Sequence, residues 1–273
     1  MSRAEAVNPA AREDSGARER VEISGLRFDR VTMAQSIDRI MAGVRSGVGG
    51  WVVTPNLEIA RRASKDASWC ETLNGAELVV ADGMPIIWAS RVQGCALPER
   101  VAGSSMLEPL SKSAGERGAK VFLLGGNPGV ADRAAEVLRE RCPGLVIAGT
   151  ECPPMGFEAD ASYVAGLREK LVNAGPDLVY VALGSPKQER LILDLRPSLP
   201  GAWWLGIGIS LSFLTGEVQR APLWMQRLGL EWVHRLVQEP RRLARRYLVD
   251  GLPFALVLLM GGLRRRLRGG GRN

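Results

Sequence analysis

Residues 121–129 read VFLLGGNPG, and residues 178–188 read LVYVALGSPKQ. Each segment is an apolar run that ends in glycine and leads into a helical pattern. Neither run alternates between apolar and polar residues, and continuous apolar runs are typical of parallel strands buried on both faces. These two segments therefore indicate an α/β fold in which buried strands alternate with helices.

The same alternation extends outward from both segments. Further strands are predicted at residues 21–23, 51–53, 78–81, 145–148 and 203–207. Helices are predicted at residues 33–44 after a capping box, at 57–65, after Pro85, up to Arg141, at 161–174 and from Gln188. Right-handed crossovers between such strands predict a Rossmann-like layered, mostly parallel sheet flanked by helices.

The composition of the 273-residue chain excludes several kinds of chemistry. His234 is the single histidine, so a zinc site built on several histidines is excluded. No Gly-x-Ser-x-Gly turn accompanies it, which argues against a Ser-His-Asp triad. The four cysteines form no C-x-x-C pair and favour a reducing, cytoplasmic setting. Carboxylates, amides and arginines are the groups left to carry chemistry.

The net charge of +7 is unevenly distributed along the chain. Residues 220–273 hold twelve arginines and three acids, which is +9, whereas residues 1–219 hold 24 basic and 26 acidic residues, which is −2. We therefore divide the chain into a disordered leader (1–20), an α/β body (21–219) and a basic C-terminal appendage (220–273). A basic block of this size usually meets phosphates.

The appendage combines this charge with apolar patterns. Residues 220–238 are predicted to form one amphipathic helix, and the apolar run 252–263 is followed by a cluster of arginines. This run is shorter than the roughly 20 residues that a bilayer-spanning helix needs. It favours an interfacial helix on an anionic membrane. Nucleic acid is disfavoured as a partner because no motif that reads it is present.

Polar and glycine residues follow the predicted strands. Ligands of parallel α/β sheets bind outside the carboxyl ends of the strands, so these residues should converge on one rim. They are Thr54, Asn56, Asp82, Gly125, Gly126, Ser185 and Gln188.

Taken singly, these rim residues have structural alternatives. Asp82 precedes a glycine and could simply form a turn, although a carboxylate in a partly dry cleft can act as a general base. Thr54 and Asn56 could be a helix start. Gly125 and Gly126 fit a tight turn as well as a nest for phosphate.

Longer motifs in the chain resemble those of the WecG/TagA/CpsF glycosyltransferases, glycosyltransferase family 26. The motifs are TPN (54–56), ADGM (81–84), ERVxGS (99–104), LGGxPGVA (124–131), VALGSPKQE (181–189), GxG (206–208), RAP (220–222) and GLEWxxRLxxEPRR (229–242). The resemblance covers residues 21–247, and the blocks at 184–189 and 229–242 are its most specific parts.

The resemblance implies inverting transfer of a sugar, typically N-acetylmannosamine, from a UDP-sugar to a polyprenyl-diphosphate-linked sugar. The setting would be the cytoplasmic face of the bacterial plasma membrane, in cell-surface or exopolysaccharide biosynthesis. By resemblance, Asp82 is the base and Arg100 assists the departing diphosphate. The substrate-binding candidates are Thr54, Asn56, Gly125, Gly126, Ser185, Gln188, Arg235, Arg241 and Arg242. No cofactor is expected, and arginines should replace a metal because no Asp-x-Asp motif is present.

The chain departs from the family pattern at Ser105 and Ser212, where many members have acids, and in the loop at 152–157. These departures leave the sugar open, and a hexose is an alternative to N-acetylmannosamine. A second hypothesis is a catalytically silent subunit that binds nucleotide-sugar or lipid. Retention of Asp82, Arg100 and Gln188 argues against it. The oligomeric state is open, a homo-oligomer included.

Overall fold

The computed structural model describes residues 18–269, and residues 1–17 of the predicted leader lie outside it. Its centre is a sheet of six parallel strands in the order β4-β3-β8-β7-β5-β6. The strands are β3 (Gly50–Val53), β4 (Leu78–Val79), β5 (Lys120–Gly125), β6 (Val146–Glu151), β7 (Leu178–Ala182) and β8 (Trp203–Gly206). The predicted Rossmann-like layered sheet is therefore confirmed.

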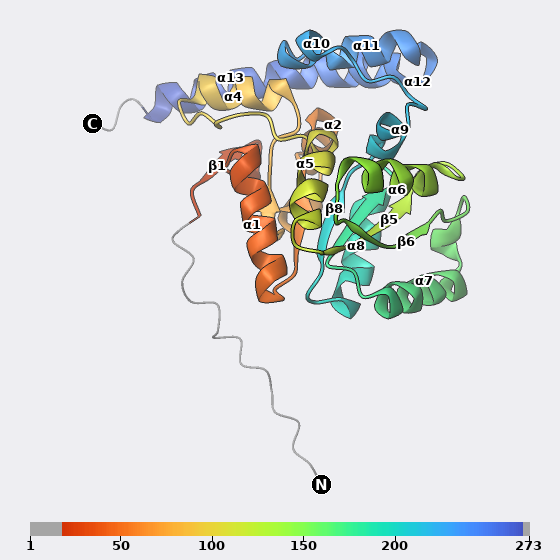
Figure 1. Ribbon diagram of the computed structural model, residues 1–273. Helices are drawn as coiled ribbons and strands as arrows, with labels where there is room; N and C mark the ends of the chain where they lie inside the picture. Colours follow the sequence, from red (N-terminus) through yellow and green to blue (C-terminus); the bar gives the residue numbers. More distant parts are fainter. Residues whose placement is uncertain (1–17, 270–273) are drawn as a thin grey trace.

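Helices cover both faces of this sheet (Figure 1). One face carries α1 (Met33–Ser46), α5 (Gly103–Gly115), α6 (Val130–Arg141) and α9 (Ser210–Leu214). The other face carries α2 (Leu57–Ala63), α3 (Ala67–Asn74), α4 (Met84–Gln93), α7 (Ala161–Ala174) and α8 (Lys187–Leu195). Short 3-10 turns lie at Phe157–Ala159 and Arg196–Ser198. The central strands β3, β7 and β8 are buried along their whole length, as their continuous apolar sequences predicted.

Helix α5 was missing from the sequence prediction. Its sequence, GSSMLEPLSKSAG, is rich in residues that favour turns, and Pro109 lies inside the helix. The helix forms because Met106, Leu107, Leu110 and Ala114 bury one face against the sheet. Tertiary packing outweighs local propensity here.

The N-terminal strand does not join the main sheet. β1 (Arg20–Ile23) pairs antiparallel with β2 (Leu26–Asp29) in a hairpin of its own. Asp29 holds the hairpin to the body, because its buried carboxylate accepts hydrogen bonds from Arg20 Nε (3.1 Å) and from the backbone N–H of Val79 (2.8 Å). The predicted leader boundary is corrected accordingly, since Arg20 belongs to β1.

The appendage is made of helices, but its first helix was predicted wrongly. Instead of one helix over 220–238, the structure has α10 (Leu223–Arg227) and α11 (Glu231–Gln238). The break falls at Gly229, whose φ of +73° is a left-handed conformation. A Cβ at Gly229 would lie 2.4 Å from Met84 Cγ, so the chain bends where it touches α4.

The appendage then continues through α12 (Pro240–Ala244), a π-helical segment (Arg245–Gly251) and α13 (Leu252–Gly269). Judged by length and composition alone, the continuous helix Pro240–Arg268 is long and apolar enough to cross a membrane. The sequence analysis underestimated the length of this helix because it considered only the apolar run 252–263. In the structure α13 lies beside α4, and Leu258 is buried against the body (Figure 1).

Candidate active site

Asp82 lies at the carboxyl end of β4, where three segments of the body are joined. Its backbone N–H donates to the carbonyl of Pro55 (3.0 Å), in the loop that follows β3. The neighbouring Ala81 carbonyl accepts from the N–H of Val101 (2.9 Å). These bonds bring the loops at 54–56, 81–83 and 100–105 together at one rim of the sheet. Convergence of the first two loops was predicted from the sequence, whereas that of 100–105 was not.

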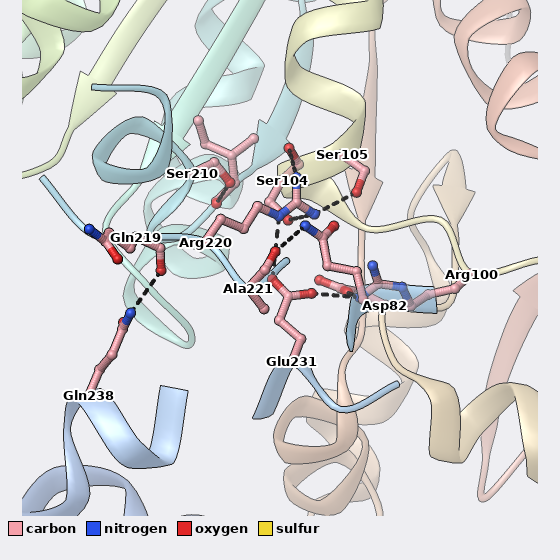
Figure 2. Close-up of polar contacts among 12 residues, drawn as sticks. Asp82, Arg100, Ser104, Ser105, Ser210, Gln219, Arg220, Ala221, Glu231 and Gln238 are labelled. Atoms are coloured by element: carbon pink, nitrogen blue, oxygen red, sulfur yellow. Dashed lines mark hydrogen bonds and ion pairs between the residues drawn. The ribbon is translucent and has the colours of Figure 1, made fainter. Parts of the chain in front are cut away.

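Arg100 is the closest cation to Asp82 among the described residues. Its Nη1 lies 3.9 Å from Asp82 Oδ1, and the two side chains are 18% and 27% exposed. The same Nη1 donates a shorter hydrogen bond of 3.1 Å to Glu231, at the start of α11 (Figure 2). The two candidates selected from the sequence, Asp82 and Arg100, therefore lie side by side, and Glu231 of the appendage contacts the same arginine.

The surroundings of Asp82 make its carboxyl less acidic. The pKa of Asp82 is raised from an ordinary value of 3.8 to about 6, chiefly by burial, with the nearby Glu231 charge acting in the same direction. Arg100, Arg220 and Arg235 act in the opposite direction. A carboxylate with a pKa near 6 is ionised at neutral pH and takes up a proton more readily than an exposed aspartate.

Arg220 connects the appendage to the start of α5. Its guanidinium donates to Ser104 Oγ (3.2 Å) and Ser105 Oγ (2.7 Å), and its Nε lies 3.4 Å from Glu231 Oε1 (Figure 2). Ser105, one of the departures from the family pattern, therefore contacts an arginine beside the site.

Thr54 and Asn56 lie on the same rim but make different contacts. Asn56 Oδ1 accepts from the backbone N–H groups of Glu58 (3.0 Å) and Ile59 (3.1 Å), so it caps α2. The helix-start interpretation of this motif is therefore confirmed for Asn56. Thr54 Oγ1 faces Gly103, at the start of α5, where an added Cβ would lie 3.4 Å from it.

Gly125 and Gly126 form the turn between β5 and the loop before α6. Both have positive φ angles, of 104° and 85°, and the Gly126 N–H donates to the carbonyl of Ala182 (2.9 Å). A Cβ at Gly125 would lie 2.6 Å from that same oxygen, so only glycine fits. This geometry requires the tight-turn interpretation, while phosphate binding there stays a prediction.

Ser185 and Gln188 follow β7. The Gln188 side chain is 5% exposed, and its Oε1 accepts from the N–H groups of Gly184 (3.2 Å) and Gly208 (3.1 Å). Gln188 therefore joins the loops that follow β7 and β8, and its Nε2 donates to Glu189 (3.1 Å). Its predicted contact with substrate is untested, and its side chain serves to hold two rim loops together.

Glu189 is a buried acid that the sequence analysis did not select. It is 2% exposed, burial raises its pKa, and its Oε2 has no hydrogen-bond partner within the described residues. Ser185 Oγ is likewise buried without a partner in that part of the chain. The signal available in the sequence was the position of Glu189, directly after the selected Gln188 and at the start of a predicted helix.

The three predicted arginines of the appendage occupy different surroundings. Arg235 lies near the site, because its guanidinium carbon and that of Arg220 are each 5.9 Å from the centre of the Phe213 ring. Arg241 and Arg242 are exposed at the start of α12, and Arg242 pairs with Glu239. The structure brings Arg235 toward Asp82 and leaves Arg241 and Arg242 on the surface.

Arg220 and Glu231 complete the site, although neither was selected as a site residue from the sequence. The available signal was composition, since Glu231 is one of three acids among the twelve arginines of the appendage. Within residues 18–269, no group of three or more histidine, cysteine or acidic side chains is arranged to hold a metal ion.

A rim of this kind, with a poised carboxylate among arginines, suits transfer of a group from a phosphate leaving group. The sequence matches the model of the WecG/TagA/CpsF family of glycosyl transferases over residues 21–268. The chain therefore belongs to this family and is a glycosyltransferase.

One relative is the N-acetylglucosaminyldiphosphoundecaprenol N-acetyl-beta-D-mannosaminyltransferase of Bacillus subtilis (strain 168). It is 34% identical over 195 residues, which cover 71% of this chain and 74% of the relative.

Proposed function

We propose that this protein transfers a sugar, with inversion, from a UDP-sugar to a sugar carried on polyprenyl diphosphate. The sugar is an N-acetylhexosamine of the N-acetylmannosamine type or a hexose. The observation that carries the proposal is the Asp82 carboxyl, with a pKa raised to about 6, beside Arg100 at the rim of the sheet. The activity named for the B. subtilis relative supports the acceptor class.

Asp82 acts as the general base in this proposal. An acceptor hydroxyl attacks the anomeric carbon from the face opposite the diphosphate, and its proton passes to the Asp82 carboxylate. The bond from the anomeric carbon to the phosphate oxygen breaks, and UDP leaves with the electron pair. A single displacement of this kind inverts the anomeric centre.

Arginines stabilise the departing diphosphate. Arg100 and Arg220 both contact Glu231, and Arg220 and Arg235 both lie over the Phe213 ring, so three guanidinium groups gather near Asp82 to share the charge of a diphosphate. We propose that they take the place of a divalent metal, so that transfer requires no cofactor.

The remaining rim residues are assigned to the donor. Gly125, Gly126 and Ser185 end adjacent strands, β5 and β7, and their loops meet at the same edge of the sheet. Thr54 and Asn56 flank Asp82 through the Pro55 contact, and Gln188 keeps the β7 and β8 loops in register. We assign Arg241 and Arg242 to a longer-range role in attracting the anionic lipid acceptor.

The appendage docks the enzyme on the membrane in this proposal. Leu252, Leu256, Met260, Leu263 and Leu267 recur at three- and four-residue intervals on α13, and each is at least 46% exposed. We call these five residues the apolar stripe. Of the most apolar 18-residue window of this helix, 22% is buried in the protein, which leaves the stripe free to enter lipid.

Charge supports the same orientation. Arg264, Arg265, Arg266 and Arg268 are exposed beside the end of the stripe. Arginines next to an apolar helix face attract anionic lipids and remain in the headgroup region. The enzyme would therefore be peripheral on the inner face of the bacterial plasma membrane, where lipid-linked acceptors are accessible.

An assay of the purified protein tests the function. A panel of UDP-hexoses and UDP-N-acetylhexosamines is offered with a polyprenyl-diphosphate-linked sugar, and the product's anomeric configuration is determined. We expect one donor to be used, with inversion, and Asp82→Asn to lose nearly all of this activity. Binding of UDP-sugar without turnover for any donor would favour the alternative, a catalytically silent binding subunit.

A further inference from the structure

Glu231 is an acid in a strongly basic segment, and it lies at the junction between the appendage and the body. Its side chain is 16% exposed and lies between arginines from two different parts of the chain. Neither the proposed base chemistry nor the proposed stabilisation of the leaving group uses this carboxylate.

The contacts of Glu231 join the appendage to the active-site rim. Oε2 accepts from Arg100 Nη1 (3.1 Å), across 131 positions of sequence, and Oε1 lies 3.4 Å from Arg220 Nε (Figure 2). Arg220 continues the chain of contacts to Ser104 and Ser105 at the start of α5. One carboxylate therefore orients two arginines that both face the site.

The position of Arg100 depends on this contact. Arg100 Nη1 is 3.1 Å from Glu231 but 3.9 Å from Asp82, so the shorter bond is to the appendage. A guanidinium released from Glu231 can close on Asp82 and form a tight ion pair. A carboxylate in such a pair has a lower pKa and accepts a proton less readily.

We propose that Glu231 is a positioning residue for the transfer reaction. It holds Arg100 beside Asp82 while preventing the two from closing into an ion pair. This inference rests on the proposed function of Asp82 as base.

Three cations and one anion from the surrounding elements act on the Asp82 carboxyl. Arg100 comes from the loop before α5, Arg220 from the segment before α10, and Arg235 from α11. Against these three cations stands Glu231, also from α11. Neutralising Glu231 leaves the three cations unopposed, which favours the ionised form of Asp82 and lowers its pKa.

Glu231→Gln tests the proposal through the pH dependence of kcat/KM. We expect the midpoint of the acidic limb to move to lower pH by roughly 0.5 to 1 unit, which is the scale of one nearby charge in a partly buried site. We also expect kcat at pH 8 to fall by about tenfold, because Arg100 loses its position and Asp82 becomes a weaker base.

Glu22→Gln is the matched control. Glu22 pairs with Arg265 and so also connects the body to the appendage, but it lies on β1, outside the site. This variant should keep both the pH profile and the rate of the wild type. A shift as large as that of Glu231→Gln would overturn the proposal, because loosening the appendage anywhere would then be sufficient.

Glu231→Asp keeps the charge but is one methylene too short to reach both arginines in place. It should shift the acidic limb of the kcat/KM profile in the same direction by a smaller amount. If Glu231→Gln does not fold, Glu231→Asp can be measured in its place. An acidic limb at the wild-type position in every folded variant of Glu231 would overturn the proposal, even if the rate were lower.

A direct titration separates this inference from the proposed function. The ¹³C resonance of the Asp82 carboxyl, assigned by comparison with Asp82→Asn, is followed against pH in substrate-free wild type and Glu231→Gln. We expect the midpoint of this titration to lie at a lower pH in Glu231→Gln than in the wild type. If no UDP-sugar is turned over by the wild type, the proposed function fails, whereas the titration still decides whether Glu231 controls Asp82.

Discussion

The body and the appendage are stabilised in different ways. In the body, side chains cap α1, α2, α3 and α7, and apolar residues fill two cores on either side of the sheet. In the appendage no side chain caps α10, α11 or α12, and large apolar side chains stay exposed. Four helices of the body therefore have local start signals, whereas α5 in the body and the described helices of the appendage depend on what they contact.

The body and the appendage also differ in net charge. Residues 1–219 carry −2, whereas residues 220–273 carry +9, a charge that fits the proposed docking on an anionic membrane. The candidate active site lies where the two regions meet, because Asp82 comes from the body while Arg220, Glu231 and Arg235 come from the appendage.

The largest expected effect comes from the body. Asp82→Asn should reduce transfer by about 10³-fold, because the amide cannot take the acceptor proton. Binding of UDP, measured by calorimetry, should persist and serves as the control for folding. Turnover at more than about a tenth of the wild-type rate would contradict the assignment of Asp82 as base.

The same variant should be more stable than the wild type at pH 8. The folded-state pKa of Asp82 is raised to about 6 from 3.8, so the folded protein binds this proton more tightly than the unfolded chain. The ionised carboxylate therefore costs stability above pH 6, and the cost vanishes below pH 4. Denaturant unfolding should show a gain of about 1 kcal/mol at pH 8 and none at pH 4. An equal effect at both pH values would contradict the raised pKa.

The junction between the two regions should govern the pH profile of the wild type. Because the base form of Asp82 is lost on protonation, kcat/KM should fall about tenfold per unit below pH 6. The measurement is the initial rate at low substrate from pH 4.5 to 8.5, with stability checked at each pH. A midpoint near the ordinary aspartate value would mean that the site is wetter than the structure shows.

Substitutions in the apolar stripe test the appendage alone. Leu256→Glu with Met260→Glu should reduce co-sedimentation with vesicles containing anionic lipid by about tenfold or more, since two apolar contacts with lipid are lost. Val172→Glu, an exposed apolar position on α7 in the body, is the matched control and should leave vesicle binding unchanged. Equal binding by the wild type and the stripe variant would refute membrane docking through α13.

The smallest expected effect is that of chelation. If arginines of both regions stabilise the diphosphate, EDTA should leave the rate of transfer unchanged. Activity that is lost with EDTA and restored by Mg²⁺ would show that the cations at the junction are insufficient.

Much of the fold was predictable because it depends on local pattern and on the rules of parallel sheets. The helix at 161–174 and the capping box before α1 match the structure, and the strands differ from it by a few residues at their ends. Convergence of the loops at Thr54, Asp82 and Gly125 on one rim follows from parallel strands alone. Helix α5 was missed because its helicity comes from packing. The hairpin was missed although its signal is local, since Ser24 and Gly25 form a two-residue turn with positive φ angles.

The sequence by itself determined the α/β sheet and the separation of a nearly neutral body from a basic appendage, and it selected Asp82 and Arg100 as candidate site residues. Only the tertiary structure decided that Glu231 reaches Arg100, that Gln188 turns inward to hold two loops, and that the chain breaks at Gly229. The physical reason is distance along the chain. Local patterns encode burial and helix ends, whereas an ion pair between residues 131 positions apart exists only once the appendage has packed on the body.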